Sequence, residues 1–119
     1  MERATIINVA VLLSTLMCSN VAAEMENVSG ALLKKLCNSY VDRPASTFDG
    51  MCIGYVVGVM SVVEYTNYFC RPVNSTHSQA TLVVKKYLFE HPEKLHLAAD
   101  GLVLDALINA FPCPKSYTD

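Results

Sequence analysis

The sequence lacks a concentration of charge of either sign. Charged residues make up 17% of its 119 residues, the formal net charge is −2, and no run of like charges occurs. Proteins that bind nucleic acid or an anionic membrane through electrostatics carry clustered basic residues. The composition therefore argues against nucleic acid and against a membrane surface as partners.

The sequence also lacks an apolar run long enough to cross a bilayer, which takes about 20 residues. The longest run outside the N-terminus covers residues 51–63 and is interrupted only by glycine and serine. The N-terminal apolar stretch, residues 4–17, follows Arg3 and precedes small residues at 21–23, the pattern of a cleavable signal peptide. We expect cleavage after Ala23, so that residues 1–23 are a signal peptide and residues 24–119 form one exported domain.

No convincing β-strand pattern, internal repeat or glycine-rich phosphate loop is present, and apolar residues recur at helical spacing instead. We expect an all-α domain with four main helices. The first should cover residues 28–40, where Leu32, Leu36 and Tyr40 recur every fourth residue, and the second should cover residues 48–65. The predicted apolar face of the second helix consists of Phe48, Cys52, Tyr55, Val56, Val59 and Val63.

The opposite face of this second predicted helix carries small residues, namely Gly50, Gly54, Gly58 and Ser61. Small residues four apart let a neighbouring helix approach closely. Each glycine also costs about 1 kcal/mol of helix propensity relative to alanine. We therefore expect tertiary packing to hold this helix.

The third helix should begin at Thr76, because Thr76 and Gln79 form a capping-box pattern, and end before His91. Its apolar stripe consists of Ala80, Val83, Val84, Tyr87 and Leu88, with Lys85 and Lys86 predicted to face water. The fourth helix should cover residues 97–111 and has only a narrow polar stripe: Gly101, Asp105 and Asn109, with Asp100 beside it. A helix that is apolar nearly all round must be covered. It is either the central helix of the domain or part of a dimer interface.

Four cysteines follow residue 23: Cys37, Cys52, Cys70 and Cys113. An even number in a small exported chain predicts disulfides. Cys52 and Cys70 lie at opposite ends of the second helix, about 27 Å apart, whereas a disulfide needs Cα atoms within about 7 Å. The first two helices should lie antiparallel, which brings Cys37 near Cys52. The sequence therefore predicts the pairs Cys37–Cys52 and Cys70–Cys113.

Catalysis or metal binding would need thiolates that these disulfides remove. The options are a Cys52 or Cys70 nucleophile with His91 or His96 as base, and a zinc site made of Cys70, His91 and His96. The acids that could pair for proton transfer stand in separate helical contexts: Glu64, Asp100 and Asp105. We expect no enzymatic activity, no metal and no cofactor.

Five short motifs occur in a characteristic order along the chain: CIGYVVGV at 52–59, FCRP at 69–72, VKKYL at 84–88, HPEKLH at 91–96 and AFPCP at 110–114. Together they resemble the Rap/Tai family of immunity proteins from type VI secretion systems, and the resemblance covers residues 32–114. It implies a periplasmic, helical, commonly homodimeric protein, related in architecture to acid-stress chaperones of the HdeA type. It further implies that the protein docks on a peptidoglycan amidase effector and blocks its active-site cleft.

The turn between the third and fourth predicted helices concentrates charged and histidine side chains, and binding residues gather on such loops. The candidate effector-binding residues are Glu90, His91, Glu93, Lys94 and His96, followed by Lys85 and Lys86 on the third helix. The alternative function is a periplasmic chaperone that binds unfolded chains through an exposed apolar helix face. That alternative predicts weak, promiscuous binding and dimer dissociation at acid pH.

Overall fold

The computed structural model describes residues 27–115. Its elements are α2 (Gly30–Cys37), α3 (Thr47–Val63), α4 (His77–Glu90), the 3₁₀ turn η1 (Pro92–Lys94) and α5 (Ala99–Ala110). Residues 27–115 contain no β-strand, only an isolated bridge between Ser29 and Ala98. The predicted all-α fold with four main helices is confirmed. The predicted signal peptide, residues 1–23, and the cleavage site after Ala23 lie outside the described residues.

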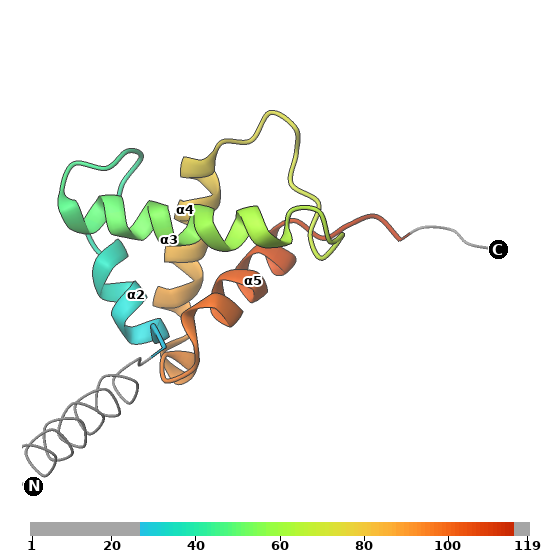
Figure 1. The fold of residues 1–119 in the computed structure, drawn as a ribbon. Helices are drawn as coiled ribbons and strands as arrows, with labels where there is room; N and C mark the ends of the chain where they lie inside the picture. The colour runs from blue at the N-terminus through green and yellow to red at the C-terminus, as the bar shows by residue number, and fades with distance from the viewer. Residues whose placement is uncertain (1–26, 116–119) are drawn as a thin grey trace, which may run out of the picture.

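The helices cross rather than run side by side. In Figure 1, α3 passes in front of α4, and α2 and α5 flank α4 on the same side of α3. Helix α2 meets the start of α3 at a steep angle, so the predicted antiparallel arrangement is wrong (Figure 1). No helix within residues 27–115 is long and apolar enough to span a membrane.

Two disulfides close the fold, and both predicted pairs are confirmed. Cys37 at the end of α2 bonds to Cys52 in α3, with Cα atoms 5.0 Å apart. Cys70 bonds to Cys113 across 43 residues, with Cα atoms 4.7 Å apart. The first pair joins α2 to α3, and the second ties the segment after α3 to the segment after α5.

Side chains at the starts of three helices satisfy backbone N–H groups that have no partner inside the helix. Ser29 does so for α2 by accepting a hydrogen bond from the backbone of Leu32. Thr76 and Gln79 form the predicted capping box at the start of α4. Ser46 accepts a hydrogen bond from the backbone of Asp49 and starts α3 one residue earlier than predicted. Helix α3 also ends earlier, at Val63, and α2 is shorter than predicted at both ends.

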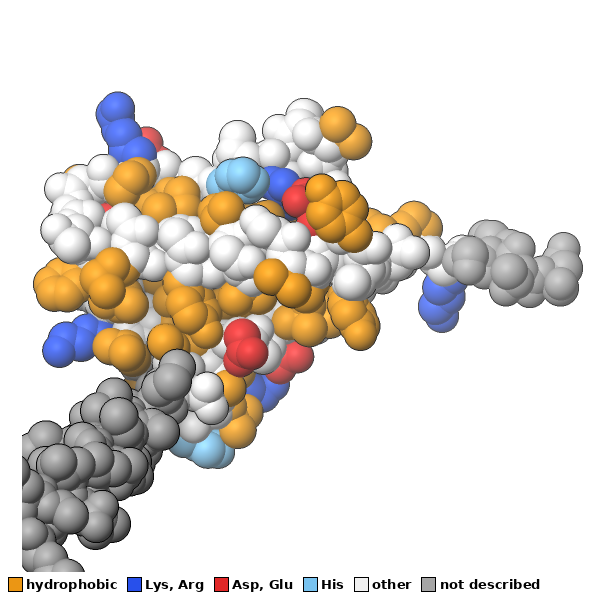
Figure 2. Space-filling view, viewed as in Figure 1, with side chains coloured by type: hydrophobic (Ala, Val, Ile, Leu, Met, Phe, Trp, Pro, Cys, Tyr) orange, Lys and Arg blue, Asp and Glu red, His pale blue; other side chains and the backbone are white. Residues whose placement is uncertain are grey.

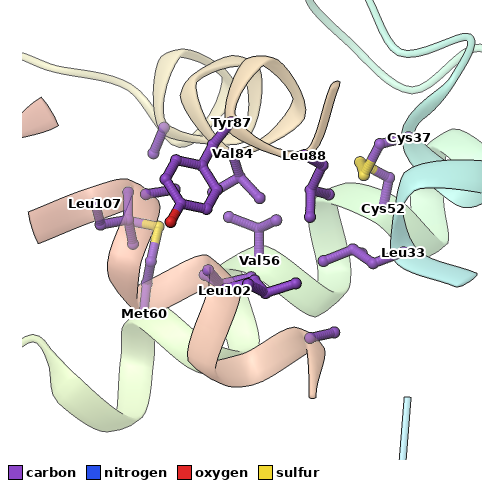
Figure 3. Packing of buried hydrophobic residues seen from close by; sticks show 14 of the residues in the cluster. Leu33, Cys37, Cys52, Val56, Met60, Val84, Tyr87, Leu88, Leu102 and Leu107 are labelled. Carbon is purple, nitrogen blue, oxygen red and sulfur yellow. A yellow bond between two sulfur atoms is a disulfide. The ribbon is translucent and has the colours of Figure 1, made fainter. Parts of the chain in front are cut away.

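The core lies where all four helices meet. Figure 3 shows Val56 of α3 among side chains from α2, α4 and α5, with Met60, Tyr87 and Leu107 grouped at one end. Helix α5 packs one face against the other helices and is not covered all round as a central helix would be: its buried residues are Ala99, Leu102, Val103, Ala106 and Leu107. Its polar stripe, Gly101, Asp105 and Asn109, is exposed as predicted.

The predicted apolar faces of α2 and α3 are partly wrong. Leu33 is fully buried in α2, whereas Leu32 is 45% exposed. In α3, the inward-facing residues are Asp49, Cys52, Val56 and Met60, so Asp49 rather than Phe48 is buried in the first turn; Phe48 is 57% exposed and the unpredicted Met60 is buried. The predicted close helix contact at Gly50, Gly54 and Gly58 is also wrong, since a Cβ at any of them would meet nothing within 4 Å among the chain's atoms.

Candidate binding site

The turn between α4 and α5 is held by the first turn of α2. The backbone N–H of Gly30 donates to the Leu97 carbonyl oxygen at 2.9 Å, and that of Ala31 donates to the Leu95 carbonyl oxygen at 2.9 Å. The N–H of Ala99 donates in return to the Val28 carbonyl oxygen at 2.8 Å. Because the first N–H groups of a helix have no partner within it, these bonds satisfy α2 and fix the turn together.

Gly30 makes this close approach possible. A Cβ at position 30 would meet a side-chain methyl of Leu102 and would lie 3.2 Å from both the Cα and the carbonyl oxygen of Leu95. The backbone of Leu95 belongs to the turn and can move little. The absence of a side chain at Gly30 is therefore what lets α2 contact the turn directly.

His91 ends α4 and is fixed against Tyr87. Its Nδ1 lies 2.8 Å from the Tyr87 carbonyl oxygen, which requires the tautomer that carries hydrogen on Nδ1. The two rings stack with centroids 4.0 Å apart and an interplanar angle of 26°. Pro92 follows at the first position of η1, where its fixed φ favours the tight turn.

Lys94 is fixed by the same tyrosine. Its Nζ donates to the Tyr87 hydroxyl at 2.9 Å and lies 5.4 Å from the centroid of the Tyr87 ring. The hydrogen bond to Tyr87 raises the pKa of Lys94 above its ordinary value, and the charges of Asp105 and Glu93 raise it further, outweighing partial desolvation. Lys94 therefore carries a positive charge at any physiological pH, at a fixed position on the turn.

The remaining candidates on the turn extend into solvent. Glu93 and His96 are exposed, and Glu90 is exposed beside Lys86, with Oε1 and Nζ 3.8 Å apart. An exposed ion pair of this length contributes little to stability. The structure thus brings together all five predicted turn residues: His91 and Lys94 are held in place, and the other three are free to contact a partner.

The two lysines of α4 differ from each other, and only Lys86 agrees with the prediction. Lys86 is exposed as expected, but Lys85 is half-buried, and its Nζ donates to the Tyr40 carbonyl oxygen at 2.8 Å. Tyr40 itself lies in the core. The prediction that Lys85 faces water is wrong, because the end of the α2 segment packs over α4 and offers a carbonyl acceptor.

Two residues near the turn were missed by the sequence analysis. Tyr87 was assigned only to the apolar stripe, yet its hydroxyl and carbonyl oxygens organise the turn. Phe89 was not assigned a place, and it is 42% exposed beneath the Nζ of Lys34 at 4.7 Å from the ring centroid. The available signal was local: both aromatic residues lie in the last turn of the helix, within four residues of the helix-ending His91-Pro92 pair.

The described residues do not assemble the thiolate nucleophile or the zinc site that the sequence analysis considered. All four cysteines of residues 27–115 are in disulfides, so neither Cys52 nor Cys70 offers a thiolate to His91 or His96. Within the same residues, no group of three or more histidine, cysteine, aspartate or glutamate side chains is arranged to hold a metal ion. What the site offers is a fixed shape with charges at defined positions.

Fold and site together define a small, disulfide-linked helical domain with a rigid, charged turn. Residues 29–113 match the family of Rap1a immunity proteins, and the chain belongs to that family. No curated protein matches the sequence. Membership confirms the resemblance found from the sequence motifs and indicates immunity to a type VI secretion effector, and therefore a cognate effector as partner. The family is generally non-enzymatic, and the disulfides fit an exported protein.

Proposed function

We propose that this protein is a periplasmic inhibitor that binds a peptidoglycan amidase effector of a type VI secretion system and blocks its active-site cleft. One observation carries the proposal: in a member of an immunity family, the turn from Glu90 to His96 is held by the backbone of α2 on one side and by the core residue Tyr87 on the other. A turn that is ordered before binding loses little conformational entropy in the complex, which favours high affinity. The protein acts without catalysis, and residues 1–23 export it.

The turn is suited to entering a cleft. It lies at the lower edge of the bundle in Figure 1, where α4 leads into α5. Exposed Glu93 lies in η1, the short 3₁₀ turn that begins with Pro92, and exposed His96 follows two residues after η1 ends. Lys94 adds a fixed positive charge. The charged side chains of the turn can pair with polar groups beside a catalytic centre. The turn would then exclude peptidoglycan by occupying its place in the cleft.

The test is inhibition of the amidase encoded beside this gene by the chain from Glu24 onward. We expect stoichiometric inhibition of peptidoglycan hydrolysis and one tight complex by calorimetry. Replacing Glu90, Glu93 and Lys94 together by alanine should weaken binding by at least about tenfold. A matched triple alanine variant at Lys35, Asp42 and Arg43, which are exposed away from the turn, serves as control.

Each possible outcome of this experiment bears on a different part of the proposal. Wild-type affinity in the triple turn variant would eliminate the turn as the binding surface. Failure of the wild-type protein to bind any type VI amidase of the same genome would overturn the proposed function. Weak binding to many unfolded proteins, with no amidase complex, would support the chaperone alternative instead.

We also propose that two copies associate through the glycine-bearing face of α3. Figure 2 shows a band of white backbone along α3 with apolar side chains beside it, and Met51 and Val62 are 52% and 77% exposed. A groove of about 270 Å³ runs between α3 and α5 and is almost entirely apolar; its lining residues are Val59, Val62, Val63, Asp100, Gly101 and Leu104. Open glycines at 54 and 58 would let a second helix approach closely.

Sedimentation of charge variants tests this dimer. Gly54→Glu and Gly58→Glu place a carboxylate in space that is open in the single chain, so the fold should persist while the dimer dissociates. Ala31→Glu, an exposed small residue in the first turn of α2, is the matched control and should leave the dimer intact. A wild-type protein that sediments as a monomer at 100 µM, roughly the range of weak self-association, would contradict the proposal.

A further inference from the structure

A second surface, formed by α2 and α4, combines exposed apolar side chains with positive charge. A shallow groove of about 320 Å³ lies there, and we call it the lysine groove; its lining residues are Tyr40, Val41, Leu82, Lys85, Lys86 and Phe89. Val41 is 70% exposed, Phe89 42% and Leu82 36%. Contact with a partner would bury most of this apolar surface, and exposed aromatic side chains in such positions often dominate binding energy.

The positive charges around the groove are held in place. The Nζ of Lys34 lies 4.7 Å from the centroid of the Phe89 ring, and that of Lys85 lies 5.9 Å from it. Both distances are within the range of a cation–π contact. Lys85 is fixed further by its hydrogen bond to the Tyr40 carbonyl oxygen. Two ammonium groups are therefore ordered over one half-exposed aromatic ring.

These charges are not neutralised by the protein itself. Within residues 27–115, neither Lys34 nor Lys85 forms an ion pair with a carboxylate, and the lining of the groove contains no acidic side chain. The third lysine, Lys86, pairs only weakly with exposed Glu90 at 3.8 Å. The groove thus combines apolar side chains with lysine ammonium groups, although the whole chain has a formal charge of −2.

We propose that the lysine groove binds a segment of the amidase in which carboxylate side chains flank one large apolar side chain. The proposal rests on the proposed inhibitory function and names a second contact for the same partner. Phe89 lies in the last turn of α4, next to Glu90, where the turn begins, so the groove and the turn are close enough along α4 for one partner to contact both. The apolar side chain packs on Phe89 and Leu82, and the carboxylates face Lys34 and Lys85.

Charge complementarity of this kind has a kinetic signature. Opposite charges steer encounter, so they act mainly on the association rate and are screened by salt, whereas buried apolar contacts act mainly on dissociation. Reversing Lys34 and truncating Phe89 should therefore alter different rate constants. A merely structural role for either side chain would not separate the two rates in this way.

The experiment measures association and dissociation of the purified amidase by surface plasmon resonance at low and high salt. Lys34→Glu should lower the association rate about tenfold at low salt, with much of the effect lost at 0.5 M salt. Phe89→Ala should raise the dissociation rate about tenfold. Lys35→Glu, at the exposed neighbour of Lys34 in sequence, and Tyr65→Ala, an exposed aromatic residue elsewhere, are the matched controls.

A charge-swap identifies the occupant. A carboxylate on the amidase that is found by cross-linking near Lys34 should, when replaced by lysine, restore the binding lost in Lys34→Glu. Wild-type rates in both Lys34→Glu and Phe89→Ala, with full inhibition of the amidase, would overturn the lysine groove and leave the proposed function intact. Binding of the groove to anionic vesicles, with amidase rates unchanged in both variants, would assign it to a membrane and overturn the proposal. Absence of any amidase complex would overturn both proposals.

Discussion

The Nζ of Lys94 lies 2.9 Å from the hydroxyl oxygen of Tyr87. Tyr87 is buried, with its ring in the hydrophobic core and its hydroxyl at the boundary of the turn. The turn is therefore connected to the core through one side chain that also stacks on His91. This connection explains how a surface segment that contains no regular helix beyond η1 can keep a defined shape.

Removing only that hydroxyl should affect binding more than folding. Tyr87→Phe retains the ring and its stacking on His91 but leaves Lys94 without its hydrogen-bond acceptor. We expect a loss of about fivefold in affinity for the amidase, the size of one net hydrogen bond, with little change in the urea midpoint. Tyr68→Phe, at an exposed tyrosine, is the control. An unchanged affinity would show that the position of Lys94 does not matter for binding.

Two glycine substitutions should change stability in opposite directions. Gly30→Ala inserts a methyl group against Leu102 and the backbone of Leu95, and such overpacking costs about 1–3 kcal/mol. Gly50→Ala adds a methyl group in open space on a helix and should stabilise by up to about 1 kcal/mol. Urea denaturation measures both. Equal effects of the two substitutions would refute the close approach between α2 and the turn.

Acid should weaken the hydrogen bonds that the Asp49 carboxylate accepts from Ser39 and Ala45. This buried carboxylate accepts hydrogen bonds from the Ser39 hydroxyl at 2.5 Å and from the Ala45 backbone N–H at 3.0 Å. The Ser39 hydrogen bond, and then those from Ala45 and Ser46, lower the pKa of Asp49 below its ordinary value despite partial desolvation. A lowered folded-state pKa contributes stability above the unfolded pKa, and that contribution is lost as pH falls through the folded pKa.

The matching experiment compares urea denaturation at pH 7 and pH 3. Wild-type protein should lose stability between these values, whereas Asp49→Asn should be less stable at pH 7 and change less with pH. Asp42→Asn, at an exposed aspartate, should keep the wild-type pH dependence. If the stability of Asp49→Asn changed with pH in parallel with the wild type, titration of the Asp49 carboxyl would not be the cause of the change.

The two disulfides should differ in their resistance to reduction. Cys37 and Cys52 are fully buried, while Cys70 is exposed and Cys113 half-buried. Because thiol–disulfide exchange requires access to sulfur, mild reductant followed by alkylation should label Cys70 and Cys113 first. Loss of this 43-residue loop closure should lower the free energy of unfolding by about 4 kcal/mol, if chain entropy is the main term. Simultaneous labelling of all four cysteines would contradict the difference in access.

Much of the fold could be predicted because the responsible signals are local. The capping box at Thr76 places the start of α4, and the polar link containing Pro44 separates α2 from α3. The disulfide pairs were also predicted correctly, although the assumed antiparallel arrangement of α2 and α3 was not. The pairing was still correct because Cys37 ends α2 and Cys52 lies near the start of α3, which is where these two helices meet.

The faces of α3 could not be predicted in the same way. Apolar residues occur all around this helix, so periodicity alone does not distinguish the side that contains Phe48 from the side that contains Met60. The choice depends on where α4 and α5 lie. At the candidate site, likewise, the sequence predicted which residues lie on the turn. It did not predict that His91 and Lys94 are hydrogen-bonded to Tyr87.

What the sequence determined by itself was the kind of structure: four helices, their approximate ends, the pairing of the cysteines and the place of the charged turn. These follow from spacing, capping and covalent reach, which act over a few residues or one short loop. Only the tertiary structure decided that the turn packs closely against Gly30, that Lys85 binds the Tyr40 carbonyl oxygen, and that Lys34 lies over Phe89. Each of these joins segments far apart in the chain, and such contacts depend on how the helices cross.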